Sequence, residues 1–574
     1  MPTPTQEKPT DEQLSPLGRS LNESLNLARQ VLLVSAPMGI LVGVAIGAYD
    51  WVINELLWSH VTRCRLVVQM WAPLAAMVAA GLLLRLFRVP SSSMADEVVN
   101  AYHQREAAMP AKTAWGKLVA SVATMGLGAS AGMEGASKWL GATIGSVLQT
   151  ALNRLPFRAT RGDVKTTLIS GGSAGIAAIF RAPLSGAIMG VESPYKHDLA
   201  HEALVHALVA SATSFWAYTR LRPATPYFPV TFHYVLTTKD LLVALPLGLC
   251  AGAASHLFLW TLRYWRRRFG NLPGPLPLRM AAAGALLVLI AFAGYWTLGR
   301  PVTLQAGLPV ANLLLNGGFG LRAALLVFVL KLLATTITFG GGGVGGLFVP
   351  TATIGAALGA CFDQIFAASH PGVFTLLGIA AFAGASYNSI LFSAVFVAEA
   401  TGNVFLVVPA LIASSFAFLV SAGVSNSRAQ RARRPGWRDA LAKIPVEQLM
   451  VTRIVTASPS QTLESFAHSV LVTHQFKALP VIDEKGVLLA MVSVGHLRSV
   501  ARNDWARVIV SDVMDRSVRT ICPEQSAADA DATFNQTPYD YIPVVDPRTY
   551  QLIGILSHSD VYRSLDTKPS RYAA

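Results

Sequence analysis

Apolar stretches fill most of the chain between about residues 30 and 425, and charged residues become frequent again only after Ser427. Over all 574 residues, 52% are hydrophobic and 14% are charged. Soluble proteins average about 25% charged residues. A soluble fold needs charged side chains to cover its surface, so this deficit and its position along the chain predict a membrane domain over residues 30–426.

Stretches long enough to cross a bilayer recur through this region. A crossing needs about 20 mostly apolar residues, and the candidates are 30–49, 68–88, 240–262, 278–298, 321–338 and 403–424. Residues 1–29 are polar and show no cleavable signal peptide, so we expect them to form an N-terminal segment. The chain is therefore predicted to be an integral membrane protein with the lipid bilayer as a partner.

Basic residues gather beside these stretches, at 263–268 and 428–434. Cytoplasmic loops next to membrane spans are rich in Lys and Arg. This pattern explains the net charge of +14 without a nucleic-acid partner, and none is expected. We expect both termini to be cytoplasmic and the membrane to be a bacterial inner membrane.

Glycine interrupts two apolar segments, 122–152 and 335–365, and four glycines follow one another at 340–343. Each glycine costs a helix about 1 kcal/mol relative to alanine. Non-helical backbone at membrane depth persists only where it lines a cavity or is buried in protein. Close helix packing through small residues is the simpler interpretation. The pattern favours a pair of broken helices whose N-terminal ends point at a buried site.

Two further segments resemble each other, 180–192 and 387–399. In each, an aromatic residue opens an apolar run that ends at a glutamate twelve residues later, and a glycine-rich segment precedes it by some 40 residues. Paired interrupted segments in two halves of a membrane protein point to a binding site between the halves. The sequence thus indicates a duplicated membrane domain.

The C-terminal part has a different pattern, after a basic linker at 427–444. Matched landmarks recur about 64 residues apart: Val446-Glu-Gln-Leu-Met450 with Val510-Ser-Asp-Val-Met514, Leu479-Pro-Val-Ile-Asp483 with Ile542-Pro-Val-Val-Asp546, and Ala490-Met-Val-Ser493 with Gly554-Ile-Leu-Ser557. Such order and spacing define a tandem repeat, here 445–505 and 506–568 with a tail at 569–574. Each unit is expected to be a small βαβ-type module, and together they resemble a CBS-domain pair.

The membrane part resembles the CLC family of chloride channels and chloride/proton exchangers. Gly132-Met-Glu-Gly135, with glycines at 141 and 145, is similar to a hallmark of that family, and Gly345-Gly-Leu-Phe-Val-Pro350 is similar to its GxFxP motif. The segments ending at Glu192 and Glu399 also match, and an attached CBS pair is common. The resemblance implies an α-helical polytopic fold, an inverted repeat of broken, tilted helices, followed by a cytosolic α/β CBS pair. It also implies a homodimer with one pore in each subunit.

The family match assigns functions to particular residues. Helix N-termini carry partial positive charge and free N–H donors, so several that converge can bind an anion. Glu134 matches the gating glutamate, whose carboxylate competes with the anion. The expected anion-binding residues are Ser92, Gly132, Gly135, Gly346, Leu347 and Phe348. Met133 and Ala136 replace a basic residue and a proline of the family motif, and the loop at Ser92 lacks the family's glycines and proline.

Two other differences concern transport mode. The alignment puts Ser193 where exchangers carry a proton-relay glutamate, and a shift of one residue would make Glu192 the relay. The family's inner tyrosine is missing, with Gln430 or a neighbouring serine in its place. These differences favour a chloride channel modulated by its CBS pair; the alternative is a chloride/proton exchanger. A CBS-linked divalent-cation transporter is a remote alternative, because such a site needs carboxylate oxygens and the spans contain few.

The CBS pair carries one candidate nucleotide site. Ser557 and Asp560 stand where adenosine-binding members contact the ribose, whereas the first repeat has His496 there. An adenine nucleotide is one interpretation and a purely structural dimerising module is the other. No metal site, required cofactor or enzymatic activity is expected; the transported ion is chloride or another monovalent anion.

Overall fold

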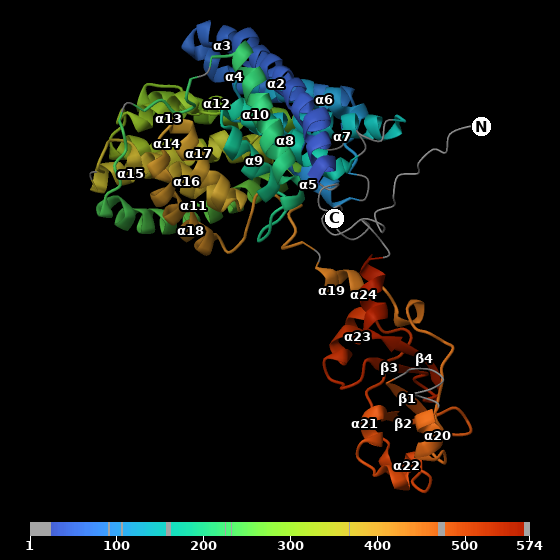
Figure 1. Cartoon of the computed structure of the whole chain (residues 1–574). Coiled ribbons are helices and arrows are strands. Elements are labelled where there is room, and N and C mark those ends of the chain that lie inside the picture. The colour runs from blue at the N-terminus through green and yellow to red at the C-terminus, as the bar shows by residue number, and fades with distance from the viewer. Residues whose placement is uncertain are drawn as a thin grey trace, which may run out of the picture. The chain divides into compact units, whose positions relative to one another are not determined.

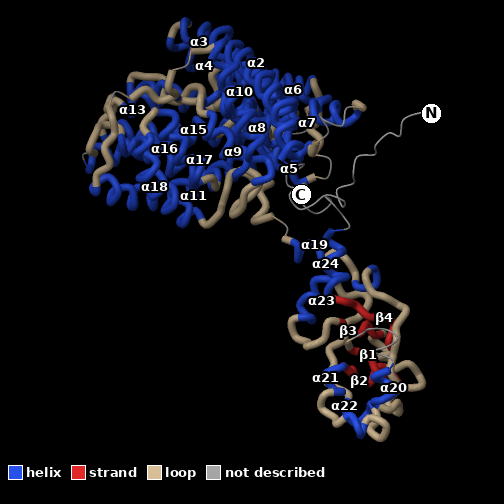
Figure 2. Tube along the Cα trace, in the orientation of Figure 1, coloured by secondary structure: helices blue, strands red, loops and turns tan. Residues whose placement is uncertain are grey.

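The chain folds into two compact units that divide after Arg433. The computed structural model (Figure 1) describes residues 24–89, 92–104, 107–156, 162–223, 225–230, 232–366, 368–434, 436–468 and 477–566. Helices build the first unit, and all the strands in the described ranges belong to the second (Figure 2). The two units are described separately.

The first half of the helical unit runs from η2 to α10. Its elements are η2 (Val31–Ser35), α2 (Ala36–Asp50), η3 (Trp51–Trp58), α3 (Ser59–Arg63), α4 (Leu66–Leu86), α5 (Ala95–His103), α6 (Ala111–Gly126), α7 (Glu134–Arg154), α8 (Val164–Phe180), α9 (Pro183–Glu192), η5 (His201–Ala203) and α10 (Leu204–Leu221). The segments η2 and η3 are π-helical turns, so α2 and its neighbours form one continuous but irregular helix.

The second half repeats the same order of elements. It contains α11 (Thr238–Gly270), α12 (Leu276–Leu298), α13 (Leu308–Leu315), α14 (Leu321–Gly340), α15 (Phe348–Phe366), α16 (Val373–Tyr387), α17 (Ile390–Thr401), η6 (Val404–Leu406) and α18 (Val407–Ser421). In the first half α7 packs on α8, α8 on α9 and α10, and α10 on α2. In the second half α15 packs on α16, α16 on α17 and α18, and α18 on α11. The predicted duplication is therefore present in the fold.

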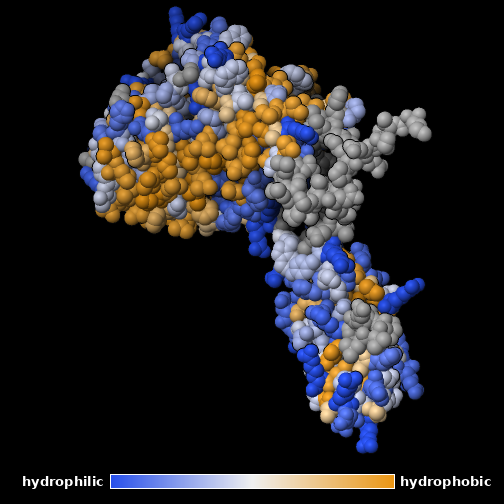
Figure 3. Space-filling model, in the orientation of Figure 1, coloured by the Kyte–Doolittle hydropathy of each residue, from blue (hydrophilic) through white to orange (hydrophobic). Residues whose placement is uncertain are grey.

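Six helices in the described ranges are long and apolar enough to cross a membrane. They are Ser24–Arg63, Leu66–Leu86, Thr238–Gly270, Leu276–Leu298, Leu321–Gly340 and Val404–Ser421. Each one contains or overlaps a stretch that the sequence predicts. The first differs most, because the helix continues past residue 49 through the π-helical turn η3. Figure 3 shows a broad apolar surface on the visible face of this unit, as lipid contact requires.

The two glycine-rich segments break where the sequence indicates. Helix α6 ends at Gly126 and α7 begins at Glu134; α14 ends at Gly340 and α15 begins at Phe348. A glycine with positive φ follows the end of each first helix by two residues. Gly128 follows α6 with a φ of 94°, and Gly342 follows α14 with a φ of 99°. Glycine adopts this conformation without the steric cost that a side chain would add. The chain can therefore reverse at matching points in both halves.

The C-terminal unit contains α19 (Trp437–Leu441), η7 (Val446–Gln448), α20 (Leu463–His468), β1 (Ala478–Ile482), β2 (Leu488–Ser493), α21 (Val494–Leu497), η9 (Arg502–Asp504), α22 (Val510–Val513), α23 (Ala527–Phe534), β3 (Tyr541–Val545), β4 (Leu552–Ser557) and α24 (His558–Asp566). β1 and β3 open the same hairpin in each repeat. Ala478 pairs with Ser493, and Tyr541 pairs with Ser557.

The expected βαβ module is present only in reduced form. The full strands pair antiparallel, as β1 with β2 and β3 with β4. The parallel partner is a single bridge in each repeat, Ala457 with Val481 and Ile521 with Val544. The segment before each helix is thus too short to form a complete third strand. Separate apolar cores around Phe466 and Phe534 stabilise the two repeats.

Candidate functional site

The two broken helices meet through the loops that precede them. The Gly132 amide donates to the Gly346 carbonyl at 2.8 Å, and the Gly346 amide donates to the Gly132 carbonyl at 2.6 Å. This pair of hydrogen bonds is an antiparallel bridge between the halves. It brings the N-terminus of α7 beside that of α15, as the sequence predicts for a buried site. A Cβ atom at Gly346 would collide with the Glu134 carboxylate and the Gly135 amide, so the approach requires glycine.

Glu134, the first residue of α7, reaches across to the other helix. Its side chain is 2% exposed. One carboxylate oxygen, Oε1, accepts hydrogen bonds from the amides of Phe348 and Val349, the latter at 3.3 Å. The second oxygen has no partner among the described residues. Glu134 Oε1 thus occupies the position that an anion would take at the N-terminus of α15.

A cavity of about 340 Å³ opens beside this contact. Its wall contains Glu134 and four of the six predicted anion-binding residues, namely Ser92, Gly135, Gly346 and Leu347. Gly132 lies in the bridge instead. Phe348 presents its amide to Glu134, and its ring packs among aromatic rings, with centroids 5.0 Å from Phe180 and 5.6 Å from Tyr387. The structure therefore gathers most of the predicted residues around one space.

One further cavity residue, Tyr387, is not among those predicted from the sequence. Tyr387 lines the wall, with its hydroxyl beside the Leu347 amide and the Asn426 side chain. It is the aromatic residue that opens the second of the two similar runs, and that signal was available. Gln430 lies close by, and its Nε2 donates to the carbonyls of Ser193 at 3.1 Å and Tyr387 at 3.4 Å. Gln430 or a neighbouring serine stands in place of the family's inner tyrosine, but Tyr387, at the end of α16, brings a different tyrosine hydroxyl to the same cavity.

Basic residues also line this cavity and a neighbouring one. Arg266, Arg428, Asn426 and Ser427 line both this cavity and a second cavity of about 470 Å³. Lys196 and Arg263 add two more positive charges to the second cavity. A cleft lined by one sign of charge concentrates ions of the opposite sign. The second cavity, whose charged wall residues are all basic, is thus suited to attract anions.

Glu192 and Glu399 occupy matching positions in the two halves. The Glu192 carboxylate accepts from the amides of Leu391 at 3.2 Å and Phe392 at 3.0 Å, in the first turn of α17. The Glu399 carboxylate accepts from Leu184 at 3.0 Å and from the Ser185 amide at 2.8 Å, in the first turn of α9. Both oxygens of Glu192 are therefore bound to a helix N-terminus, where anionic groups are stabilised.

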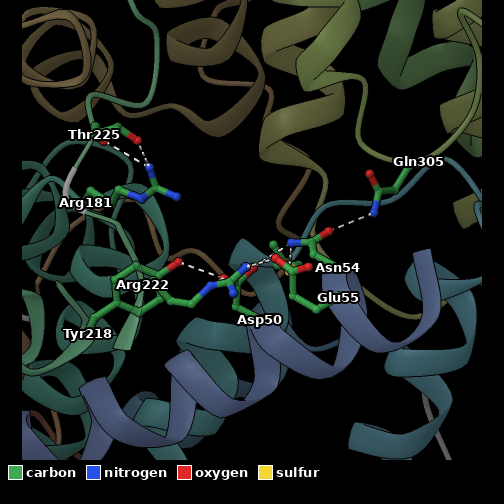
Figure 4. Close-up of polar contacts among 9 residues, drawn as sticks. Asp50, Asn54, Glu55, Arg181, Tyr218, Arg222, Thr225 and Gln305 are labelled. Atoms are coloured by element: carbon green, nitrogen blue, oxygen red, sulfur yellow. Dashed lines mark hydrogen bonds and ion pairs between the residues drawn. The ribbon is translucent and has the colours of Figure 1, made fainter. Parts of the chain in front are cut away.

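A polar network (Figure 4) lies beside Met133, the residue before Glu134, because Asn54 Nδ2 contacts Met133 Sδ at 3.8 Å. Asp50 is 3% exposed and accepts from Arg222 Nε at 2.6 Å, from the Tyr218 hydroxyl at 3.0 Å and from Asn54 at 2.6 Å. Asn54 also accepts from Gln305 at 3.2 Å. The network joins α2 and α10 of the first half to the loop at Gln305 in the second. Apart from an acidic residue inside an apolar span, no local pattern of residues indicates this network.

In the CBS pair, Ser557 and Asp560 contact each other at the start of α24. The Ser557 hydroxyl donates to Asp560 Oδ2 at 2.5 Å, and the Asp560 amide donates to the Ser557 hydroxyl at 3.1 Å. This reciprocal contact caps the helix. The cavity between the repeats, lined by Arg453, Leu479 and Tyr541 among others, measures about 20 Å³ and does not reach either residue. Ser557 and Asp560 are thus engaged with each other at the start of α24, and an adenine nucleotide at these residues stays a prediction.

The described residues contain no group of three or more His, Cys, Asp or Glu side chains that could hold a metal ion. The chemistry at Glu134 is instead that of amide donors and one carboxylate. Such a group of donors is chemically suited to bind and release a monovalent anion, and the carboxylate can take up a proton. Conduction requires this combination of binding and easy release.

Comparison with known proteins gives relatives named as exchangers and one named as a channel. The putative chloride channel protein ClcB-like of Ralstonia nicotianae is 27% identical over 361 residues, covering 60% of this chain and 81% of that protein. The family model described as voltage gated chloride channel matches residues 74–422, and the CBS domain model matches 446–503 and 510–567. The H⁺/Cl⁻ exchange transporter ClcA of Citrobacter koseri is 26% identical over 404 residues, covering 67% of this chain and 83% of that protein. ClcA of Cronobacter sakazakii is 25% identical over 402 residues, covering 67% and 84%.

Among solved structures, a slow cyanobacterial Cl⁻/H⁺ antiporter has a TM-score of 0.59 at 20% identity. The match covers 68% of this chain and 94% of that one. A eukaryotic CLC transporter has a TM-score of 0.56 at 19% identity, and its match covers 92% of this chain and 98% of that one. These likenesses establish the fold of the helical unit.

Proposed function

Because the chain belongs to the voltage-gated chloride channel (CLC) family of anion transporters, we propose that it carries chloride through the cavity beside Glu134. Glu134 is the gate. The observation that carries this proposal is the hydrogen bond from the Phe348 amide to Glu134 Oε1. A chloride ion needs the same donors, so the anion and the carboxylate exclude each other there.

We further propose that transport is chloride/proton exchange. Protonation neutralises the Glu134 carboxylate, which weakens its bonds to the amides of Phe348 and Val349 and frees the donors for chloride. Proton uptake and anion entry are thereby linked at one residue. The relatives named H⁺/Cl⁻ exchange transporters support this mode over the channel that the sequence favours.

A chloride channel is the second candidate, and one observation favours it. Ser193 stands where exchangers carry a relay acid, and both oxygens of Glu192 are bound to amides of α17. Ser193 has no carboxylate, and the carboxylate of Glu192 is already hydrogen-bonded. Neither side chain is therefore free to carry a proton away from Glu134. In the channel mode Glu134 still moves, but no proton crosses with the anion.

The decisive experiment uses the purified full-length chain in chloride-loaded liposomes. An outward chloride gradient is expected to drive protons into the liposomes against their own gradient, and the Glu134→Gln variant should lose this proton movement. Chloride efflux without any uphill proton movement would establish the channel mode. Absence of chloride flux in the wild-type protein would refute both transport modes.

We also propose a homodimer with one pore per subunit, in a bacterial inner membrane with both termini cytoplasmic, and a CBS pair that modulates transport. The basic segments at 263–268 and 428–434 support the orientation. Labelling of single cysteines introduced at Arg434 and Arg267 with a membrane-impermeant reagent, in cells and in inverted vesicles, tests it. Labelling in intact cells would contradict the proposed orientation.

A further inference from the structure

Lys138 is a buried cation without a local partner. It lies one helical turn after Glu134 on the same face of α7, since residues four apart share a helix face. It is 4% exposed and lines the 340 Å³ cavity. In the part of the chain that the structure describes, no acceptor lies within hydrogen-bond or ion-pair distance of its ammonium. The Asp96 carboxylate attracts the Lys138 ammonium electrostatically, but the two groups are not in ion-pair contact.

Two other buried lysines of the helical unit show the contrast with Lys138. Lys117 is paired with the Glu97 carboxylate and donates to the Ser93 carbonyl at 3.1 Å. Lys331 donates to three carbonyls, of Thr303, Leu304 and Gln305, at 2.6 to 3.4 Å. A buried charge is costly unless it is paired or hydrogen-bonded. Lys138 meets that requirement only if something in the cavity provides the negative charge.

The charges that face the cavity come from several elements. Glu134 and Lys138 project from α7, Asp96 from α5, and Arg266 from α11, while Arg428 follows α18. Asp96 is already bound by the Ser427 hydroxyl at 2.7 Å. Three positive charges thus face two carboxylates, one of which, Glu134, is occupied by amides. The wall retains an excess of positive charge that a monovalent anion can balance.

We propose that Lys138 forms a second, charge-bearing anion site in the cavity, between the amides at Glu134 and the basic residues Arg266 and Arg428. This inference rests on the proposed function and adds to it. Helix N-termini hold an anion by dipoles alone, whereas Lys138 gives the path a fixed full charge. The aliphatic stem of Lys138 lies against Gly172 of α8, which leaves the ammonium to face the cavity.

The test compares three variants of the full-length protein by chloride titration calorimetry in detergent and by chloride efflux from liposomes. Lys138→Met keeps the volume and removes the charge, and should weaken chloride binding about tenfold, as loss of a nearby charge in a low-dielectric site predicts. Lys138→Arg keeps the charge and should bind within a few-fold of wild type. Asp96→Asn removes a competing negative charge and should strengthen chloride binding.

The opposing interpretation makes Lys138 the structural counter-ion of Asp96. In that case Lys138→Met and Asp96→Asn would each lower the melting temperature by a similar amount. The double variant would restore the melting temperature. Chloride affinity would not rise in Asp96→Asn. That pattern, or unchanged affinity in Lys138→Met, overturns the proposal. If Lys138→Met does not fold, the affinity of Asp96→Asn decides. Wild-type protein without any chloride flux would instead refute the proposed function.

Discussion

Glu192 and Glu399 each hold the first turn of the helix from which the other projects. Glu192 ends α9 and binds the amides of Leu391 and Phe392 in α17, and Glu399 lies in α17 and binds Leu184 and Ser185 in α9. The relationship is symmetric, so the simplest role of Glu192 is the same as that of Glu399. Both carboxylates link the two halves of the membrane domain by hydrogen bonds.

This symmetry gives a matched test of the relay assignment. Hydrogen bonds to a charged group contribute about 1.5–3 kcal/mol, so Glu192→Gln and Glu399→Gln should destabilise the protein by similar amounts in thermal melts. Proton flux per chloride should be unchanged in both. Loss of proton flux in Glu192→Gln alone, with Glu399→Gln retaining it, would show that Glu192 relays protons despite its contacts.

Gly346→Ala should disturb the gate. The added Cβ would lie against the Glu134 carboxylate and the Gly135 amide. Overpacking of this kind costs about 1–3 kcal/mol, and the pH dependence of chloride flux should change because Glu134 can no longer rest on the α15 amides. Gly320→Ala is the control, since nothing lies within 4 Å of a Cβ there. Identical flux profiles for the two variants would contradict this geometry.

Tyr387→Phe removes one hydroxyl from the cavity. Loss of a typical hydrogen-bond donor costs about 1 kcal/mol, so chloride affinity should fall roughly fivefold. The ratio of nitrate to chloride flux should rise, because the weaker hydrogen-bond acceptor loses less. Competitive anion flux measures both effects. Tyr264→Phe, on the exposed face of α11, should leave the ratio as in wild type, and equal behaviour of the two variants would rule Tyr387 out.

Asp50→Asn should be strongly destabilising. It breaks the buried pair with Arg222 and leaves the guanidinium without its main carboxylate. Removing one partner of a buried pair costs about 3 kcal/mol or more. Glu55→Gln is the comparison, because the Glu55 side chain is 54% exposed and its contact with the same arginine should contribute less than about 1 kcal/mol. Thermal melts in detergent test the ranking, which equal losses would contradict.

The CBS unit should lose stability in acid through Asp515. The Ser517 hydroxyl and amide, together with the Tyr539 hydroxyl, donate to this carboxylate and lower its pKa. A lowered folded-state pKa gives stability that is present above the unfolded value of about 3.9 and is lost as the pH falls through the folded pKa.

Asp515→Asn should therefore lower protection of this unit against hydrogen exchange at neutral pH, and the difference from wild type should shrink below about pH 4. Asp540→Asn is the control, since its pair with Lys477 is well exposed and contributes little. A difference that grows on acidification would show that Asp515 does not act in this way.

Much of the fold followed from the sequence because its signals are local. Hydropathy placed the spans, and glycine clusters placed the breaks before α7 and α15. The similar runs at 180–192 and 387–399 revealed the duplication, and the tandem landmarks revealed the CBS pair. Continuation of the first helix past residue 49 was missed, because Asp50 and Glu55 make the segment look like a loop end.

The cavity wall was harder to predict. Glu134 could be identified because a carboxylate in a glycine-rich apolar span is rare. The role of Tyr387 depends on where the end of α16 lies relative to Leu347, and the isolation of Lys138 depends on which acceptors the folded chain keeps away from it. Both are long-range properties of packing. The short parallel bridges at Ala457 and Ile521 also depend on long-range packing and could not be predicted from local sequence.

The bridge between Gly132 and Gly346 also limits how the molecule can work. Its two hydrogen bonds join the halves of the protein at the point nearest the gate. A transporter that rocks one half against the other would have to break them in every cycle. If they persist, access to the two sides of the membrane must alternate through displacement of a single side chain, and the rest of the protein serves as a stationary frame.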